Sequence, residues 1–291
     1  MELRSNVTDT ALILGGGGMR GVYTAAVVET LISEEIFIDY VSGVSTGSTN
    51  LLNYISRDPA RGRTMFVDLA GDPTFAPWKS WIKGKGLVNS DFDSYDADGV
   101  LPFDFDTFMA NPAKMRIGAV DVATGQTVYW SKDDINGVDD LMQKKMASSS
   151  PPGYMPPVKI GDRLMIDGSF GEGGGIPWGI ARKDGYEKFF VVLTQERSYT
   201  RKKASRLVKM LSHKNPAVAR ATVRRPDEYN SAREQLLDLE SQGKACLFFP
   251  EHMNVATLSR DPAKQGMTYD AALEQARREV PRWKEFLGLP A

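Results

Sequence analysis

The segment that decides the fold reads Thr10-Ala-Leu-Ile-Leu-Gly-Gly-Gly-Gly-Met-Arg-Gly21. A short apolar run that ends in glycines is typical of a buried strand followed by a tight turn. Residues 19–33 then place apolar side chains three and four positions apart, and this spacing predicts a helix. Strand, glycine turn and helix in this order predict the first unit of a parallel α/β sheet.

The same succession recurs in residues 36–56, with a strand at 36–42, a turn at 43–47 and a helix at 49–56. Downstream patterns predict strands at 115–121, 126–130, 158–160 and 164–166, a helix at 139–147, and a final core strand at 188–194. The sequence of residues 73–100 predicts a loop or lid that shapes access to a site. Helical patterns then dominate at 202–212, 216–224, 228–241 and 268–287. We therefore expect a three-layer α/β/α domain with a mostly parallel sheet over residues 1–196, and a mostly helical extension over 197–291 packed on it.

Composition narrows the classes of function. A net charge of −1 provides no global field that would attract nucleic acid. The single cysteine, Cys246, excludes an internal disulfide and suits a reducing compartment. With only two histidines, His213 and His252, a multi-histidine metal site is not expected. No apolar run is long enough for a signal sequence or a membrane span, so we expect a cytoplasmic protein.

The glycine loop after the first strand leaves two functions open. Gly16, Gly18 and Gly21 match G-x-G-x-x-G between a strand and a helix, and Asp39 lies near the spacing of a ribose-binding acid, as in dinucleotide-binding proteins. However, backbone N–H groups without side chains at a helix N-terminus can bind any anion, including the oxyanion of a tetrahedral intermediate. The loop alone therefore indicates either a dinucleotide site or an acyl-transfer enzyme.

The second turn, Gly43-Val-Ser-Thr-Gly47, favours acyl transfer. It matches G-x-S-x-G between a strand and a helix, where small neighbours allow Ser45 to occupy a sharp, strained turn. Ser45 is therefore a candidate nucleophile. The simpler alternative is a helix cap, for which Ser48 or Thr49 would also serve. A dinucleotide site gives no reason for this second turn, whereas acyl transfer explains both.

The group that would activate Ser45 is less evident from local patterns. Asp167 followed by His213 or His252 has the chain order Ser…Asp…His of common α/β hydrolases. Both histidines fall in the helical C-terminal region, which argues against this triad. Asp167 itself leaves an apolar strand beside a glycine cluster, although Asp-Gly alone is most often a turn.

Three blocks taken together resemble the patatin-like phospholipases. They are Gly16-Gly-Gly-Met-Arg-Gly21, Gly43-Val-Ser-Thr-Gly47 and Asp167-Gly168; Ala147–Pro157, Ile176-Pro177, Pro250 and Ser259-Arg-Asp261 support them. The resemblance covers most of the chain. The sequence departs from the family at Ser169, where glycine or alanine is usual, and at Gly15, where many members carry serine or alanine.

The resemblance implies a Ser–Asp dyad without histidine. Ser45 would be the nucleophile, Asp167 the general base, and the oxyanion hole would be formed by Gly16, Gly17, Gly18 and Met19. Arg20 would either contact a phosphate headgroup or support the loop as a structural cation. The implied reaction is hydrolysis of carboxylic esters in acyl lipids, of phospholipase A or lysophospholipase type, through an acyl-enzyme and without metal or organic cofactor. A catalytically weak lipid-binding protein is the remaining alternative.

Residues 197–225 concentrate positive charge. They hold ten basic residues and no acid: Arg197, Arg201, Lys202, Lys203, Arg206, Lys209, Lys214, Arg220, Arg224 and Arg225. Apolar residues at 204, 207, 208 and 211 predict an amphipathic helix within this segment. We expect peripheral contact with an anionic membrane, to which each basic residue contributes about 1 kcal/mol. A solvated face packed on the core is the alternative.

Overall fold

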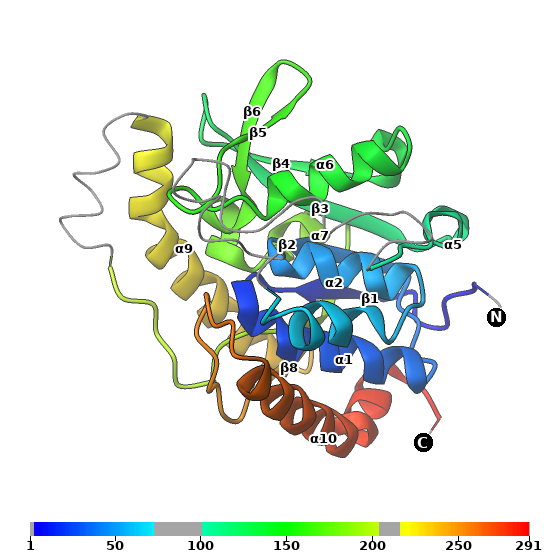
Figure 1. Cartoon of the computed structure of the whole chain (residues 1–291). Helices are drawn as coiled ribbons and strands as arrows, with labels where there is room; N and C mark the ends of the chain where they lie inside the picture. Colours follow the sequence, from blue (N-terminus) through cyan, green and yellow to red (C-terminus); the bar gives the residue numbers. More distant parts are fainter. Residues whose placement is uncertain (1–2, 73–100, 204–215, 291) are drawn as a thin grey trace.

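Eight strands form one sheet in the computed structural model, which describes residues 3–72, 101–203 and 216–290. Across the sheet the order is β5-β6-β3-β2-β1-β7-β8, and β4 pairs with β3 outside this path (Figure 1). The strands are β1 Thr10–Leu14, β2 Tyr40–Val44, β3 Lys114–Asp121, β4 Thr127–Trp130, β5 Val158–Ile160, β6 Arg163–Asp167, β7 Lys188–Val192 and β8 Ala245–Phe248. The five strands β3-β2-β1-β7-β8 run parallel. β4 and β6 each pair antiparallel with β3, and β5 pairs antiparallel with β6.

Helices cover both faces of the sheet. The described helices are α1 Gly21–Ser33, α2 Thr46–Ile55, α3 Arg61–Arg63, α5 Phe105–Ala110, α6 Val138–Ser148, α7 Trp178–Lys183, α9 Pro216–Ser241 and α10 Pro262–Leu287. Short 3-10 turns lie at η1 Gly18–Arg20, η4 Lys132–Asp134, η5 Gly168–Phe170 and η6 Glu172–Gly175, and a π-helical turn, η2, at Thr64–Asp68.

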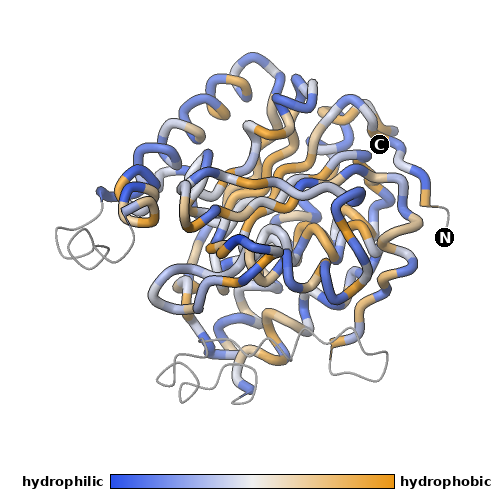
Figure 2. Tube along the Cα trace, turned by 90° about the horizontal axis from the view of Figure 1, so that it is seen from above, coloured by the Kyte–Doolittle hydropathy of each residue, from blue (hydrophilic) through white to orange (hydrophobic). Residues whose placement is uncertain are grey.

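The alternation of side chains along β1 assigns these helices to two layers. Leu12 and Leu14 join the apolar cluster that contains α1, α2 and α10, whereas Ala11 and Ile13 join the cluster that contains α7 and α9. All five residues of β1 are buried, as expected for a central parallel strand. Figure 2 shows the apolar segments gathered along the central strands. The predicted three-layer α/β/α architecture with a mostly parallel sheet is confirmed.

Several predicted boundaries were wrong. The second strand begins at Tyr40 rather than residue 36, because Ile38 forms only an isolated bridge with Val7 before the chain enters the sheet. The segments 216–224 and 228–241 form one helix, α9, which continues through Pro226. α10 begins at residue 262 rather than 268, since the Asp261 carboxylate accepts the N–H groups of the first turn.

The strand at 188–194 is not the last strand of the core. β8, from the region expected to be mostly helical, pairs in parallel with β7, and its four residues are all buried. Four apolar residues do not distinguish a strand from a buried helical turn, so only the free edge of β7 reveals this one. The C-terminal region therefore contributes to the sheet, and the division after residue 196 stays a prediction.

Two predictions fall outside the described residues: the loop at 73–100 and most of the helix at 202–212. Residues 202 and 203, at the start of that segment, are not helical. Within the described part of the chain, no helix has the length and apolar character needed to cross a membrane.

Candidate active site

Ser45 occupies a strained turn at the end of β2. Its backbone has φ 55° and ψ −130°, a combination that non-glycine residues rarely adopt. The flanking glycines are required by close approach: a Cβ on Gly43 would lie 2.5 Å from the Gly47 carbonyl oxygen, and one on Gly47 would lie 2.0 Å from that of Leu14. α2 begins at the next residue, with Ser45 at its N-cap position and without a side-chain cap. The geometry is that of a nucleophile elbow.

Asp167 meets Ser45 across the sheet. The Ser45 hydroxyl donates a hydrogen bond of 2.8 Å to Asp167 Oδ2. The strand register explains the meeting: Val44 pairs with Gly118, and Asp167 pairs with Ala119, the next residue of β3. The ends of β2 and β6 therefore reach the same level on either side of β3.

The environment of Asp167 favours a carboxyl group of increased basicity. Burial raises the pKa of Asp167 above its ordinary value. The positive charge of Arg225, the backbone N–H of Ser169 and the hydroxyl of Ser45 oppose this rise. The Ser169 N–H donates to Oδ1 at 2.8 Å, so the two carboxylate oxygens have separate partners.

Ser148 and Ser150 support the two members of the pair, a role that their sequence context does not predict. The Ser148 hydroxyl accepts the Ser45 N–H at 2.9 Å and donates to the Gly118 carbonyl at 2.6 Å. The Asp167 N–H donates to the Ser150 carbonyl at 2.9 Å. The run of serines at 148–150, between a helix and a strand, was the feature of the sequence that could have indicated this supporting role. Which atoms these serines contact depends on where β2, β3 and β6 lie, and a local pattern does not predict that.

The glycine loop packs directly on the elbow. A Cβ on Gly16 would lie 3.1 Å from Ser45 Cβ and 2.4 Å from Ser169 Oγ. The Gly16 N–H already donates to the Gly175 carbonyl, and the Met19 N–H donates to that of Thr257, both at 2.9 Å.

The predicted set of four oxyanion donors is therefore reduced to two. Among the described residues, the N–H groups of Gly17 and Gly18 have no acceptor, and Gly18 has the positive φ of 59° that favours glycine. Gly16 and Met19 do not fit the role of donor in this structure, because a second strong acceptor would compete with their existing bonds.

The remaining candidate residues lie in different surroundings. His252 is exposed and has no described contact with Ser45 or Asp167, and His213 lies outside the described residues. Asp39 precedes β2, and its N–H donates to the Val7 carbonyl ahead of β1, so it lies at the opposite end of these neighbouring parallel strands from the glycine loop. The ribose-binding role considered for Asp39 is therefore wrong.

Arg20 follows the glycine loop in η1. Burial, together with the positive charge of Arg201, lowers its pKa. It makes no ion pair or hydrogen bond with any described residue, so no carboxylate there holds it as a structural cation.

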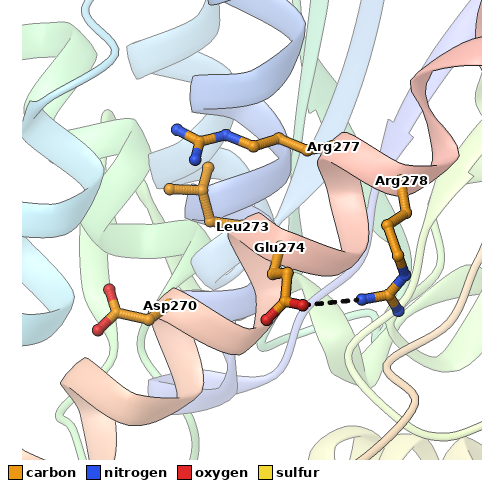
Figure 3. Close-up of a pocket in the computed structure, with 5 residues that line it drawn as sticks. All are labelled: Asp270, Leu273, Glu274, Arg277 and Arg278. Atoms are coloured by element: carbon orange, nitrogen blue, oxygen red, sulfur yellow. Dashed lines mark ion pairs between the residues drawn. The ribbon is translucent and has the colours of Figure 1, made fainter.

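A second polar region among the described residues lies on α10, away from the glycine loop. The hollow in Figure 3 is lined from one helix, α10, by Asp270, Leu273, Glu274, Arg277 and Arg278. Glu274 and Arg278 already form an ion pair of 3.6 Å there. Within the described ranges, no group of three or more His, Cys, Asp and Glu side chains could hold a metal ion.

The fold and the site define a class of protein: an α/β protein that presents a serine on a strained strand-to-helix turn. The chain belongs to the patatin-like phospholipase family, whose model matches residues 12–181. A second model, a domain of unknown function named DUF6363, matches residues 215–288. Membership places the chain in a family of lipid acyl hydrolases and confirms the resemblance read from its three motif blocks.

Individual relatives are distant. The uncharacterized protein YjjU of Escherichia coli strain K12 is 26% identical over 98 residues, which are 33% of this chain and 28% of YjjU. The crystal structure of VipD from Legionella pneumophila matches 96% of this chain and 67% of that one, with a TM-score of 0.51 and 9% identity. At that identity the likeness to VipD concerns the fold alone.

Proposed function

We propose that this chain hydrolyses carboxylic ester bonds of acyl lipids, as a phospholipase A or lysophospholipase, with Ser45 as nucleophile and Asp167 as general base. The observation that carries the proposal is the 2.8 Å hydrogen bond between Ser45 Oγ, on its strained turn, and Asp167 Oδ2. Ester hydrolysis needs a hydroxyl whose proton has an acceptor within hydrogen-bond reach, and this pair meets that condition.

In the first half-reaction, Ser45 Oγ attacks the ester carbonyl carbon while its proton passes to Asp167. The oxygen of the tetrahedral intermediate becomes an anion, and the N–H groups of Gly17 and Gly18 are the donors free to bind it. One such donor contributes about 3–4 kcal/mol of transition-state stabilisation. Collapse breaks the bond to the leaving alcohol, which receives the proton from Asp167, and leaves an acyl group on Ser45.

In the second half-reaction, water attacks the acyl-enzyme and gives a proton to Asp167. Collapse of the second intermediate releases the fatty acid, and the proton returns to Ser45 Oγ. Burial supports this use of a carboxylate, because a raised pKa makes Asp167 a stronger base than an aspartate in water.

The decisive test is covalent labelling by a fluorophosphonate, followed by intact mass measurement. We expect one label on the wild type, none on Ser45→Ala, and an unchanged label on Ser149→Ala, since the Ser149 hydroxyl has no described partner. Absence of a label on the wild type, together with binding to lipid vesicles, would favour the weak lipid-binding protein. A rise in melting temperature on adding NAD or NADP would favour the dinucleotide-binding protein.

We also propose that the segment 197–225 contacts an anionic lipid surface. Four of its described basic residues are exposed: Lys202, Lys203, Arg220 and Arg224. Arg197 is instead engaged with Glu240, in a bidentate ion pair. Exposed basic residues near a lipid surface are attracted by the negative potential of its headgroups.

A further inference from the structure

Three arginines from separate parts of the chain share one environment near the candidate dyad. Arg20 lies in η1, Arg201 follows β7 by nine residues, and Arg225 lies in α9. Burial and the positive charge of Arg201 lower the pKa of Arg225 to about 10, with a smaller contribution from Arg20. The three guanidinium groups are therefore close enough to repel one another.

No negative side chain among the described residues forms an ion pair with this arginine cluster. None of the three guanidinium groups forms an ion pair or hydrogen bond with any residue in the described ranges, and the Nε atom of each is buried without a partner. Half-buried like charges without an ion-pair partner are unfavourable, because each loses part of its water and gains repulsion. An anionic ligand would supply the missing acceptors and the missing charge.

Aromatic and polar contacts hold two of the arginines in place. The Arg225 guanidinium lies 4.4 Å from the centre of the Phe170 ring, and that of Arg201 lies 4.5 Å from the Tyr229 ring. The Asn230 side chain accepts a hydrogen bond from the backbone N–H of Arg201 at 2.9 Å and donates one to the backbone carbonyl of Arg201 at 3.0 Å. Stacked guanidinium groups keep their edges available for hydrogen bonds, so the cluster is preorganised.

The cluster adjoins the candidate dyad. Phe170, beneath Arg225, is three residues after Asp167, and the charge of Arg225 acts on that carboxylate. α9 packs against η6, since a Cβ on Gly174 would lie 2.5 Å from the Tyr229 nitrogen and 2.6 Å from the Arg225 carbonyl oxygen. Arg20 follows the free amide of Gly18 by two residues.

We propose that Arg20, Arg201 and Arg225 form an anion subsite that binds the phosphate group of the acyl substrate while its ester lies at Ser45. This inference rests on the proposed hydrolase function. Phosphate suits the cluster because guanidinium forks donate paired hydrogen bonds to its oxygens. Arg201 and Arg225 lie outside the residues 12–181 matched by the family model, so the C-terminal region of this chain would determine the preference.

The test compares two soluble short-chain substrates that differ only in the phosphate group: a monoacylglycerol phosphate and the corresponding monoacylglycerol. For Arg201→Met and for Arg20→Met, we expect kcat/KM for the phosphate ester to fall at least tenfold relative to that for the neutral ester, mainly through KM. Arg277→Met is the control, because Arg277 is an exposed arginine on α10, outside the segment 197–225, and it should leave the ratio of the two kcat/KM values unchanged. Arg225→Met is less suitable, because its charge also acts on Asp167.

If the ratio of the two kcat/KM values is the same in the variants as in the wild type, including when both values fall equally, the inference is overturned. If free inorganic phosphate alters neutral-ester turnover only when Arg201 is present, while the ratio is unchanged, the anion is a free phosphate and the assignment to substrate is wrong. Failure of the hydrolase proposal is distinguishable, because the wild type would then neither take the fluorophosphonate label nor cleave either ester. Binding would still be measurable as a melting-temperature rise with glycerol phosphate, which the inference predicts for wild type and not for Arg201→Met.

Discussion

Ser45 Oγ and Asp167 Oδ2 lie 2.8 Å apart although 122 positions separate the two residues in the chain. They meet because β2 and β6 both pair with β3, and the register brings both strand ends to the level of Ala119. Strands hold this distance more firmly than loops would, since a ladder of backbone hydrogen bonds sets the relative height of neighbouring residues.

Asp167→Asn should reduce kcat by about 100- to 10,000-fold, the usual contribution of a general base. The amide retains an oxygen for the Ser45 hydroxyl but does not accept its proton. Circular dichroism should remain that of the wild type. Asp162→Asn, in the exposed turn between β5 and β6, serves as the control and should keep full activity. Substantial activity in Asp167→Asn would contradict the proposed base.

The acid limb of the pH–rate profile should lie above the ordinary pKa of an aspartate, because burial raises the pKa of Asp167. Activity requires the ionised carboxylate, so kcat/KM should fall as the pH drops through that raised value. Arg225→Met should shift the limb to higher pH, since the positive charge of Arg225 lowers the pKa. A shift to lower pH, or none, would contradict this coupling.

Asp167 should also make the protein less stable at neutral pH. Its folded pKa is raised above the unfolded value near 3.8, so the folded state binds more protons between these two values. Stability therefore falls as pH rises through that window. Urea denaturation should show Asp167→Asn to be more stable than wild type at neutral pH, and the difference should shrink as pH approaches 3.8. A variant less stable at every pH would contradict the sign.

The strain at Ser45 should be measurable as stability. Glycine adopts φ 55°, ψ −130° with little steric penalty, whereas alanine retains the clash of its Cβ. Ser45→Gly should therefore exceed Ser45→Ala in free energy of unfolding by about 1 kcal/mol. Both variants lack the hydroxyl, so their comparison isolates the backbone. Equal stabilities would show that the turn is not strained.

Ser148→Ala should destabilise the fold by about 1–3 kcal/mol, because it leaves the Ser45 N–H and the Gly118 carbonyl without their buried partner. Activity should fall as well, since the elbow loses its support. Ser149→Ala is the adjacent control, and we expect little change, as the Ser149 hydroxyl has no described partner. Thermal unfolding and ester turnover would measure both effects, and equal losses in the two variants would contradict this role.

Vesicle sedimentation would measure the proposed lipid contact. Lys202→Glu with Lys203→Glu should weaken binding to anionic vesicles at least tenfold, because each basic residue near the surface contributes about 1 kcal/mol. In the control, two exposed lysines elsewhere, Lys159 and Lys264, are replaced by glutamate, which gives the same change in net charge. If both pairs of substitutions weaken vesicle binding equally, binding depends on net charge and not on the position of Lys202 and Lys203.

Short-range patterns determined much of this protein. The stretch Thr10–Gly21 predicted β1, the glycine loop and α1, because alternation, glycine content and helical spacing are local properties. The G-x-S-x-G turn likewise identified the strained position of Ser45, since the close approach at Gly43 arises within that turn, whereas the one at Gly47 is to Leu14 of β1.

Long-range pairings were decided only by the tertiary structure. β8 is a strand because β7 offers it a free edge, and Asp39 is excluded from the glycine loop because it lies at the other end of β2. Likewise, the convergence of Arg20, Arg201 and Arg225 depends on how α9 packs against η6. Strand order, register and helix packing join residues far apart in the chain, and no local pattern of side chains encodes those distances.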